Sequence, residues 1–453
     1  MFKYSSYLFT FLLFSFLSWN YYGIFFLVNI ILLFFIIDTI KDKSFGKKIL
    51  YVYPFFLSLN VGVTFWLYQS DPLYSIITFI SNALIMTFFF IMANLPLWKN
   101  TKVAFIIIWF ASEIILTKWD LSWPWLIFGN VLSNQWYLIQ WYSFTGVYGG
   151  SLWLLLLAFI IYMLITEGYS RLRVSMFLLC LIFPLLSLVM YNWALPETKE
   201  KETIILYTPD AATFGDSSYQ KTRTLLSVLS QKKVDKRTKI ITTELFFQIK
   251  PYDLIHRNIH YLMDSWMTDN DLTFVMGSQI ENDSANKFNG ISVINKRNTM
   301  FRTKKKYVPV SEYTPKLLVP MFGKSFYVKN QDDDSKRITG ELNTFPFVCY
   351  EILFSDFVAQ KTSDVNMIMV LASEEFMNGS FFGSLQYNNI IRIRAIENSR
   401  YLIKNSFLGK SLVVNPKGDI IDVMSSNFHQ VTVPIYQKNS FYQMLVTKLF
   451  SDE

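Results

Sequence analysis

The sequence predicts an α-helical membrane bundle fused to a layered α/β domain, and three observations support this. Of the 453 residues, 52% are hydrophobic and 18% aromatic, a more apolar composition than that of an average soluble protein. Residues 1 to 194 are mostly apolar, and the charged residues are concentrated after them. From Glu197 onward, short β-rich runs alternate with amphipathic stretches, which is the pattern of a layered α/β domain.

Apolar segments in the first part predict about seven membrane spans, several of them shorter than the ~20 residues needed to cross the hydrocarbon core. The segments are Tyr7–Ser18, Tyr22–Ile37, Leu50–Tyr68, Ile76–Met92, Val103–Leu116, Gly150–Ile165 and Val174–Tyr191. The alternative is a buried helical core in a soluble protein. So many adjacent apolar segments disfavour that alternative.

Basic residues in alternate loops predict the orientation of the bundle, because positively charged loops stay in the cytoplasm. The residues are Lys41, Lys43, Lys47, Lys48, Lys99, Lys102, Arg171 and Arg173. The N-terminus is then inside, and an odd number of spans places everything beyond Tyr191 outside the cytoplasm. The net charge of +8 does not indicate a nucleic-acid partner, because the basic residues form no single basic face.

The loop between the fifth and sixth apolar segments is rich in tryptophan. It holds Trp119, Trp123, Trp125, Trp136 and Trp141. These aromatic residues are interpreted either as anchors at the lipid–water boundary or as a lipid-facing entrance to an active site.

The second part is predicted to be one α/β domain over residues 195–437, after a bundle over 1–194 and before a short tail at 438–453. Predicted strands are Thr203–Tyr207, Lys239–Thr243, Leu272–Ser278, Gly290–Ile294, Phe345–Tyr350, Asn366–Leu371, Tyr401–Lys404, Ser411–Val414 and Val431–Ile435. Ser218–Ser230 and Ser384–Asn398 are predicted helices, and Asn415–Asp419 is a turn. The tail is too short to span a bilayer.

Cys349 is the candidate nucleophile. The only other cysteine, Cys180, lies in an apolar helix, so the two do not indicate a disulfide framework. Cys349 follows an apolar run at the expected end of a strand, where protein scaffolds present reactive side chains. A thiol that performs acyl transfer also needs a base and a group that stabilises the oxyanion.

Glu244 is the candidate base, because it ends the apolar strand Ile240–Thr243 and a carboxylate there suits proton transfer. Its alternative interpretation is a capping or solvated glutamate. The three histidines, His256, His260 and His429, do not follow strands as Cys349 does, so a Cys–His pair is the weaker hypothesis.

The segment 301–312 contains three consecutive lysines, Lys304, Lys305 and Lys306, followed by Glu312. Such a run is often a solvated loop or a patch that attracts phosphate. One lysine held near the thiol would lower the pKa of that thiol and stabilise an oxyanion, and Glu312 would orient it.

These segments, in this order and behind a bundle of spans, resemble the nitrilase superfamily and, within it, the apolipoprotein N-acyltransferase family. The resemblance covers nearly the whole chain, including the segments 122–126, 129–130, 140–142, 145–150 and 392–397. It implies an α-β-β-α sandwich for the outer domain. It also implies Glu244 as base, Lys304 as oxyanion-stabilising lysine and Cys349 as nucleophile, with Glu312, Tyr350 and Glu351 in supporting positions.

The resemblance further implies a two-step reaction without metal or cofactor. Cys349 takes an acyl chain from a phospholipid donor as a thioester, and the amino group of a diacylglyceryl apolipoprotein then accepts it. The expected location is the bacterial inner membrane, with the catalytic domain on the periplasmic face of the bilayer, and the protein is expected to be a monomer. Alternatives are a membrane-tethered amide hydrolase, an acyltransferase with another acceptor, or an inactive paralogue that binds lipoproteins or lipid.

The chain departs from the family pattern in four places. Thr243 stands where proline usually precedes the base, and Glu374-Glu375 follow Ser373 where Asn-Asp and aromatics are usual. Tyr387 occupies a position that often holds histidine, and a last membrane span is missing. The first three departures bear on substrate preference or rate, and the last bears on how the outer domain is anchored.

Overall fold

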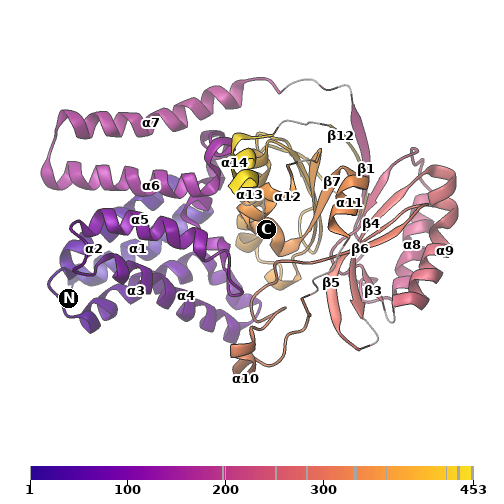
Figure 1. The fold of residues 1–453 in the computed structure, drawn as a ribbon, viewed down its shortest axis with the longest axis horizontal. Helices are drawn as coiled ribbons and strands as arrows, with labels where there is room; N and C mark the ends of the chain where they lie inside the picture. Colours follow the sequence, from indigo (N-terminus) through magenta and orange to yellow (C-terminus); the bar gives the residue numbers. More distant parts are fainter. Residues whose placement is uncertain are drawn as a thin grey trace. The chain divides into compact units, whose positions relative to one another are not determined.

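The computed structural model describes residues 2–195, 198, 200–249, 252–281, 284–329, 334–363, 365–424, 426–435 and 439–449. The chain forms two compact units (Figure 1). The first comprises Met1–Ala194 together with Ser380–Ile393, and the second comprises Leu195–Gly379 with Arg394–Glu453. A short segment from late in the sequence therefore belongs to the helical unit.

Every predicted span overlaps a helix of the first unit. The helices are α1 (Phe2–Asn20), α2 (Phe26–Ile40), α3 (Phe45–Thr64), α4 (Pro72–Ala93), α5 (Thr101–Ile115), α6 (Tyr142–Glu167) and α7 (Arg171–Asn192). Polar residues cap several of them, as short side chains do at helix N-termini. The Asp71 carboxylate accepts from the backbone N–H of Tyr74 at the start of α4, and Ser170 caps α7.

Five segments among the described residues are long and apolar enough to cross a membrane, judged by length and composition. They are Gly23–Ile40, Phe45–Gln69, Pro72–Ala93, Tyr142–Glu167 and Arg171–Asn192. The apolar character expected of a membrane protein is therefore present. Since α5 has only 15 residues, the number of spans stays a prediction, and so does the orientation that depends on it.

The tryptophan-rich loop is only partly exposed. Trp119 is 40% exposed, as an interfacial anchor would be, whereas Trp125 and Trp141 are buried. Trp125 donates its indole N–H to Oε1 of Gln386 at 2.8 Å. Gln386 comes from α13 (Phe381–Asn398), whose first residues belong to this unit. The aromatic loop is thus largely part of the packed interior.

In the described part of the second unit, twelve strands form two sheets. The first sheet has the order β12-β1-β2-β4-β5-β6, with β3 paired to β4, and the second has the order β11-β10-β9-β8-β7. The strands are β1 (Lys201–Tyr207), β2 (Lys239–Ile241), β3 (Phe247–Ile249), β4 (Thr273–Glu281), β5 (Lys287–Ile294), β6 (Thr299–Thr303), β7 (Thr344–Val348), β8 (Met367–Ser373), β9 (Tyr401–Phe407), β10 (Leu412–Val414), β11 (Ile420–Val423) and β12 (Phe428–Pro434).

Helices cover the outer faces of the two sheets. Figure 1 shows α8 (Ser218–Ser230) and α9 (Tyr252–Asn270) beside the first sheet, and α12 (Ser355–Lys361) and α14 (Phe441–Leu449) beside the second. Apolar residues of α8 and α9, such as Leu229 and Met263, pack with strand residues such as Phe274 in one buried cluster. The helix–sheet–sheet–helix arrangement confirms the predicted fold class.

The predicted strands overlap observed ones, but β3, β6 and β11 were not predicted. β6 matters most, since it ends at Thr303 immediately before Lys304. β7 ends one residue before Cys349, which begins a short 3-10 helix, Cys349–Leu353. In the tail, α14 packs on α12, where the Tyr442 and Ser355 hydroxyls lie 2.7 Å apart.

Candidate active site

Strands of both sheets end around one point of the second unit. Glu244 lies shortly after β2, Lys304 directly follows β6, Cys349 directly follows β7, and Ser373 is the last residue of β8. β7 and β8 are parallel, so their carboxyl ends meet at the same edge of the sheet. Asn405 of β9 links the two sheets there, because its amide donates to the carbonyls of Tyr207 and Ile241, each at 2.9 Å.

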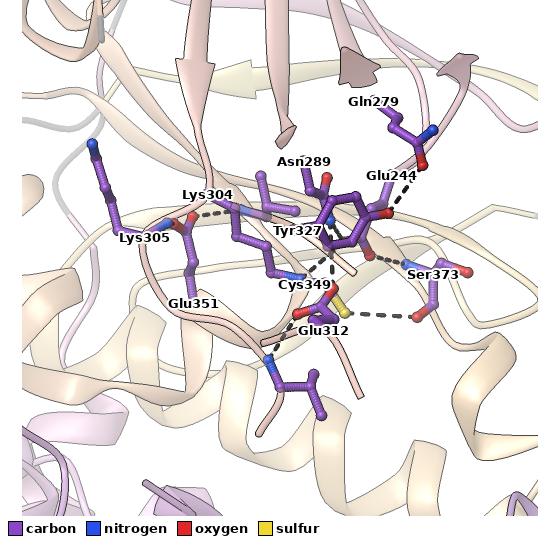
Figure 2. Close-up of polar contacts among 12 residues, drawn as sticks. Glu244, Gln279, Asn289, Lys304, Lys305, Glu312, Tyr327, Cys349, Glu351 and Ser373 are labelled. Carbon is purple, nitrogen blue, oxygen red and sulfur yellow. Dashed lines mark hydrogen bonds and ion pairs between the residues drawn. The ribbon is translucent and has the colours of Figure 1, made fainter. Parts of the chain in front are cut away.

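Lys304 lies between two carboxylates. Its Nζ is 3.0 Å from Oε1 of Glu244 and 2.7 Å from Oε1 of Glu312 (Figure 2). Burial lowers the pKa of Lys304, but the negative charges of Glu244, Glu312 and a Cys349 thiolate outweigh burial and raise that pKa well above its usual value. The buried amine is therefore a fixed cation beside the thiol.

The other two lysines of the run occupy different surroundings. The Lys305 side chain points away from Cys349 in Figure 2, and its backbone N–H donates to Glu351 at 2.6 Å. Lys306 Nζ lies 4.9 Å from the ring centroid of Phe354, in a cation–π contact. Of the three lysines, Lys304 is thus the one held between Glu244 and Glu312.

Three neighbours fix the carboxylate of Glu244. Besides the Lys304 contact, Oε1 accepts from Nδ2 of Asn289 at 2.9 Å, and Oε2 accepts from the backbone N–H of Ser373 at 3.2 Å. Gly277 of β4 allows this segment to approach closely, since a Cβ there would lie 2.2 Å from the Thr243 carbonyl oxygen. Sequence analysis missed Asn289, which lies inside β5 without any local signal of a site.

Cys349 is buried and has a strained backbone. Its φ is +40°, in the left-handed region that residues with a side chain rarely adopt, and such strain often accompanies function. Its Sγ lies 3.6 Å from the carbonyl oxygen of Ser373. Burial first, and then the charge of Glu244, raise the pKa of the thiol well above its usual value, while Lys304 acts in the opposite direction. The resting sulfur is therefore protonated, and it needs a base before it can attack.

Glu312 is the second carboxylate in contact with Lys304. Its second oxygen, Oε2, accepts from the backbone N–H of Val308 at 2.7 Å. Burial raises the pKa of Glu312, and the adjacent Lys304 cation lowers it. The structure therefore places Glu312 in direct contact with Lys304, and its orienting role stays a prediction.

Glu351 joins the ends of two strands. It forms a fully buried ion pair with Arg302 of β6, and its Oε2 accepts from the backbone N–H of Val348 at 2.8 Å. Because it also accepts from the Lys305 backbone, Glu351 braces the residues on either side of the site. Tyr350 is buried as well, and burial raises its pKa well above the usual value. Arg302 was not singled out from the sequence, although it stands two residues before Lys304.

The histidines do not join this arrangement in the described structure. His429 of β12 instead has its Nε2 2.7 Å from a carboxylate oxygen of Asp422. The side chains of His256 and His260 lie outside what the structure describes. Among the described residues, no group of three or more His, Cys, Asp or Glu side chains is placed to hold a metal ion.

Comparison with known proteins gives matches of two kinds. Residues 10–160 match the family model for the apolipoprotein N-acyltransferase N-terminal domain. The chain is 24% identical over 431 residues to an apolipoprotein N-acyltransferase of Rickettsia typhi, covering 87% of this chain and 84% of that protein. It is 25% identical over 357 residues to the one of Chlorobaculum tepidum, covering 70% of this chain and 67% of that protein.

Solved structures match about half of the chain, at lower sequence identity. A carbon–nitrogen hydrolase from Helicobacter pylori aligns over 55% of this chain and 93% of its own, with 12% identity and a TM-score of 0.37. An amidase from Nesterenkonia sp. aligns over 54% and 92%, with 14% identity and a TM-score of 0.36. The sequence matches agree with the family resemblance seen in the motifs, since the chain is similar over most of its length to apolipoprotein N-acyltransferases.

Proposed function

We propose that this protein transfers an acyl chain from a phospholipid, through a thioester on Cys349, to the N-terminal amino group of diacylglyceryl-cysteine apolipoproteins. The observation that carries the proposal is Lys304, a buried cation held by Glu244 and Glu312 beside a buried thiol. The sequence relatives, which are named apolipoprotein N-acyltransferases, supply the substrate class.

The first half-reaction forms the thioester. Glu244 takes the proton of the Cys349 thiol, and the sulfur attacks the ester carbonyl carbon of the phospholipid. Lys304 Nζ donates to the oxyanion that forms, where a positioned charge contributes most to the rate. The ester C–O bond then breaks. The departing oxygen takes the proton from Glu244, and the lysophospholipid leaves.

The second half-reaction transfers the acyl group. The amino nitrogen of the apolipoprotein attacks the thioester carbonyl, the C–S bond breaks, and an amide forms. The proton lost by the amine passes through Glu244 to the departing sulfur, which restores the thiol. A thioester suits this step because amines attack it more readily than an oxygen ester.

The helical part places the protein in the membrane, where both lipid substrates are found. In this proposal, residues 1–194 form the bundle in the bacterial inner membrane, and residues 195–437 form the catalytic domain on its periplasmic face, with 438–453 as a tail. The protein acts as a monomer. The alternating basic loops support the orientation, and the apolar segments support the membrane location.

The test is the intact mass of the purified protein after incubation with one defined phospholipid. We expect an added acyl mass that neutral hydroxylamine removes. The adduct should be absent in Cys349→Ala and retained in the matched control Cys180→Ala, which removes the other thiol. Addition of a diacylglyceryl lipopeptide should then discharge the adduct and add the same acyl mass to the lipopeptide.

Two outcomes would contradict this function. A folded protein that gains no acyl mass in the presence of lipid would indicate an inactive paralogue. An adduct that water discharges, while the lipopeptide remains unmodified, would indicate a membrane-tethered hydrolase.

A further inference from the structure

A second buried ion pair lies directly beyond the last residue of β8. Lys404 of β9 contacts Oε1 of Glu374, and both side chains are almost fully buried. The Ser406 hydroxyl donates to the same oxygen at 3.0 Å. The catalytic steps described above use neither charge, although burying two ions is costly unless their contacts are good.

The Glu374 carboxylate packs closely against Gly409. A Cβ added at Gly409 would lie 2.0 Å from Oε1 of Glu374. The backbone N–H of Glu374 donates to the carbonyl of Phe407 at 2.9 Å. Both the side chain and the peptide group of Glu374 are therefore fixed by β9 and the residues after it.

That peptide group also carries the carbonyl of Ser373. Because a peptide unit is planar, fixing the N–H of Glu374 also fixes the direction of the Ser373 carbonyl. The Ser373 carbonyl oxygen lies 3.6 Å from Sγ of Cys349, and the Ser373 N–H donates to Glu244 (Figure 2). One residue thus contacts both the proposed nucleophile and the proposed base.

We propose that Glu374 and Lys404 form a positioning pair, which holds the Ser373 backbone so that the Cys349 thiol and the Glu244 carboxylate keep their relative placement. The proposal rests on the proposed function. It assigns a role to Glu374, which stands at a departure from the usual family pattern. Neither residue of the pair is assigned a contact with substrate.

Charges near the thiol are consistent with this role. Glu244, Lys304, Glu312 and Tyr350 share the buried surroundings of Cys349. Lys404 belongs to the same group: burial lowers its pKa, while the negative charges of Glu374 and of a Cys349 thiolate act against that lowering. A substitution of Glu374 or Lys404 therefore affects the thiol in two ways: it shifts the Ser373 backbone, and it alters the charge near the sulfur.

The test measures the rate of thioester formation per reactive thiol in the full-length protein with a defined phospholipid vesicle. Active-site titration counts the thiols that accept an acyl group, so loss of folded protein does not lower this rate. We expect Lys404→Met and Glu374→Gln to slow it about 10- to 100-fold, the loss that a small misplacement of reacting groups produces. The half-saturating phospholipid concentration should stay unchanged, since the pair does not touch substrate.

Gly409→Ala tests the same idea without removing a charge. Its new methyl group would displace the Glu374 carboxylate, so it should slow acylation in the same way. Shortening the displaced side chain by Glu374→Asp in the Gly409→Ala background should recover part of the rate. If Lys404→Met does not fold, Gly409→Ala and the Gly409→Ala/Glu374→Asp double variant test the proposal instead.

The matched control is Lys239→Met. Lys239 is another buried strand lysine that is ion-paired, with Glu202, and it is not part of the Ser373 contacts. It should lower stability but leave the rate per reactive thiol unchanged. Unchanged rates in the Glu374, Lys404 and Gly409 variants would overturn the positioning role and leave the proposed function intact. Absence of a thioester in the wild-type protein would instead overturn the proposed function.

Discussion

Arg302 and Glu351 form a fully buried ion pair that joins the ends of two strands beside the candidate nucleophile. The Glu351 carboxylate also accepts from the backbone N–H groups of Val348 and Lys305, so it contacts the neighbours of both Cys349 and Lys304. The pair therefore stabilises the protein and sets the spacing of the site at the same time.

Replacing Arg302 by methionine should strongly destabilise the second unit. The change leaves Glu351 as an unpaired buried charge, a situation that costs about 3–5 kcal/mol. Thermal unfolding of the purified protein in detergent is the measurement. Arg237→Met is the control, because Arg237 is exposed and its ion pair with Asp271 is worth at most about 1 kcal/mol. Equal effects of the two substitutions would show that the buried pair is not the stronger one.

The three consecutive lysines should differ sharply in their contribution to the reaction. Lys304→Ala removes the cation between Glu244 and Glu312 and should cost at least about 3–4 kcal/mol of transition-state stabilisation. Lys305→Ala keeps the backbone N–H that donates to Glu351, and the Lys306 ammonium lies over the Phe354 ring instead of between Glu244 and Glu312. Both variants should therefore keep rates within a few-fold of wild type. The rate of acyl-adduct formation by mass spectrometry decides this, and comparable losses in all three would refute the assignment of Lys304.

Local patterns in the sequence were enough to locate the long helices of the first unit and most strands. Hydrophobic runs mark α1 to α7 because each is apolar over its own length. β6 was not predicted because a charged residue such as Arg302 usually indicates an exposed segment. The burial of Arg302 is explained by its ion pair with Glu351, which is distant in the sequence. In the same way, Glu374 reads as an isolated departure from a family pattern until Lys404 is seen beside it.

The candidate site was only partly predictable. Apolar runs that end in a functional side chain pointed to Glu244 and Cys349, since strand ends are places where scaffolds present such groups. The residues alone did not distinguish Lys304 from its two neighbours, because that choice depends on where the chain turns after β6. The contributions of Asn289 and of the Ser373 backbone depend on tertiary contacts and leave no mark in the local sequence.

Glu244→Gln should make Cys349 easier to alkylate while blocking acyl transfer. Burial and then the Glu244 charge raise the pKa of the thiol, so removal of that charge lowers this pKa and increases the thiolate fraction at a given pH. The variant should react faster than wild type with neutral iodoacetamide at each pH below the raised pKa of this thiol, because its thiolate fraction is larger there. Both proteins should carry Cys180→Ala, so that the mass change reports Cys349 alone. Slower alkylation of Glu244→Gln would show that Glu244 does not oppose ionisation of the thiol.

The anchoring of α13 should depend on Gln386. Its side-chain oxygen accepts from the indole N–H groups of Trp66 and Trp125, and its Nε2 donates to Asn20 and to the Val63 carbonyl. Gln386→Leu leaves these buried partners unsatisfied, and each costs about 1–3 kcal/mol.

A large drop in the unfolding temperature of Gln386→Leu in detergent is therefore expected. Phe381→Ala is the control on the same helix, because Phe381 is 68% exposed and its removal should change that temperature little. This contact gives a segment from late in the sequence a buried, hydrogen-bonded place within the helical unit. If Gln386→Leu unfolds at the wild-type temperature, these hydrogen bonds do not hold α13 in that unit.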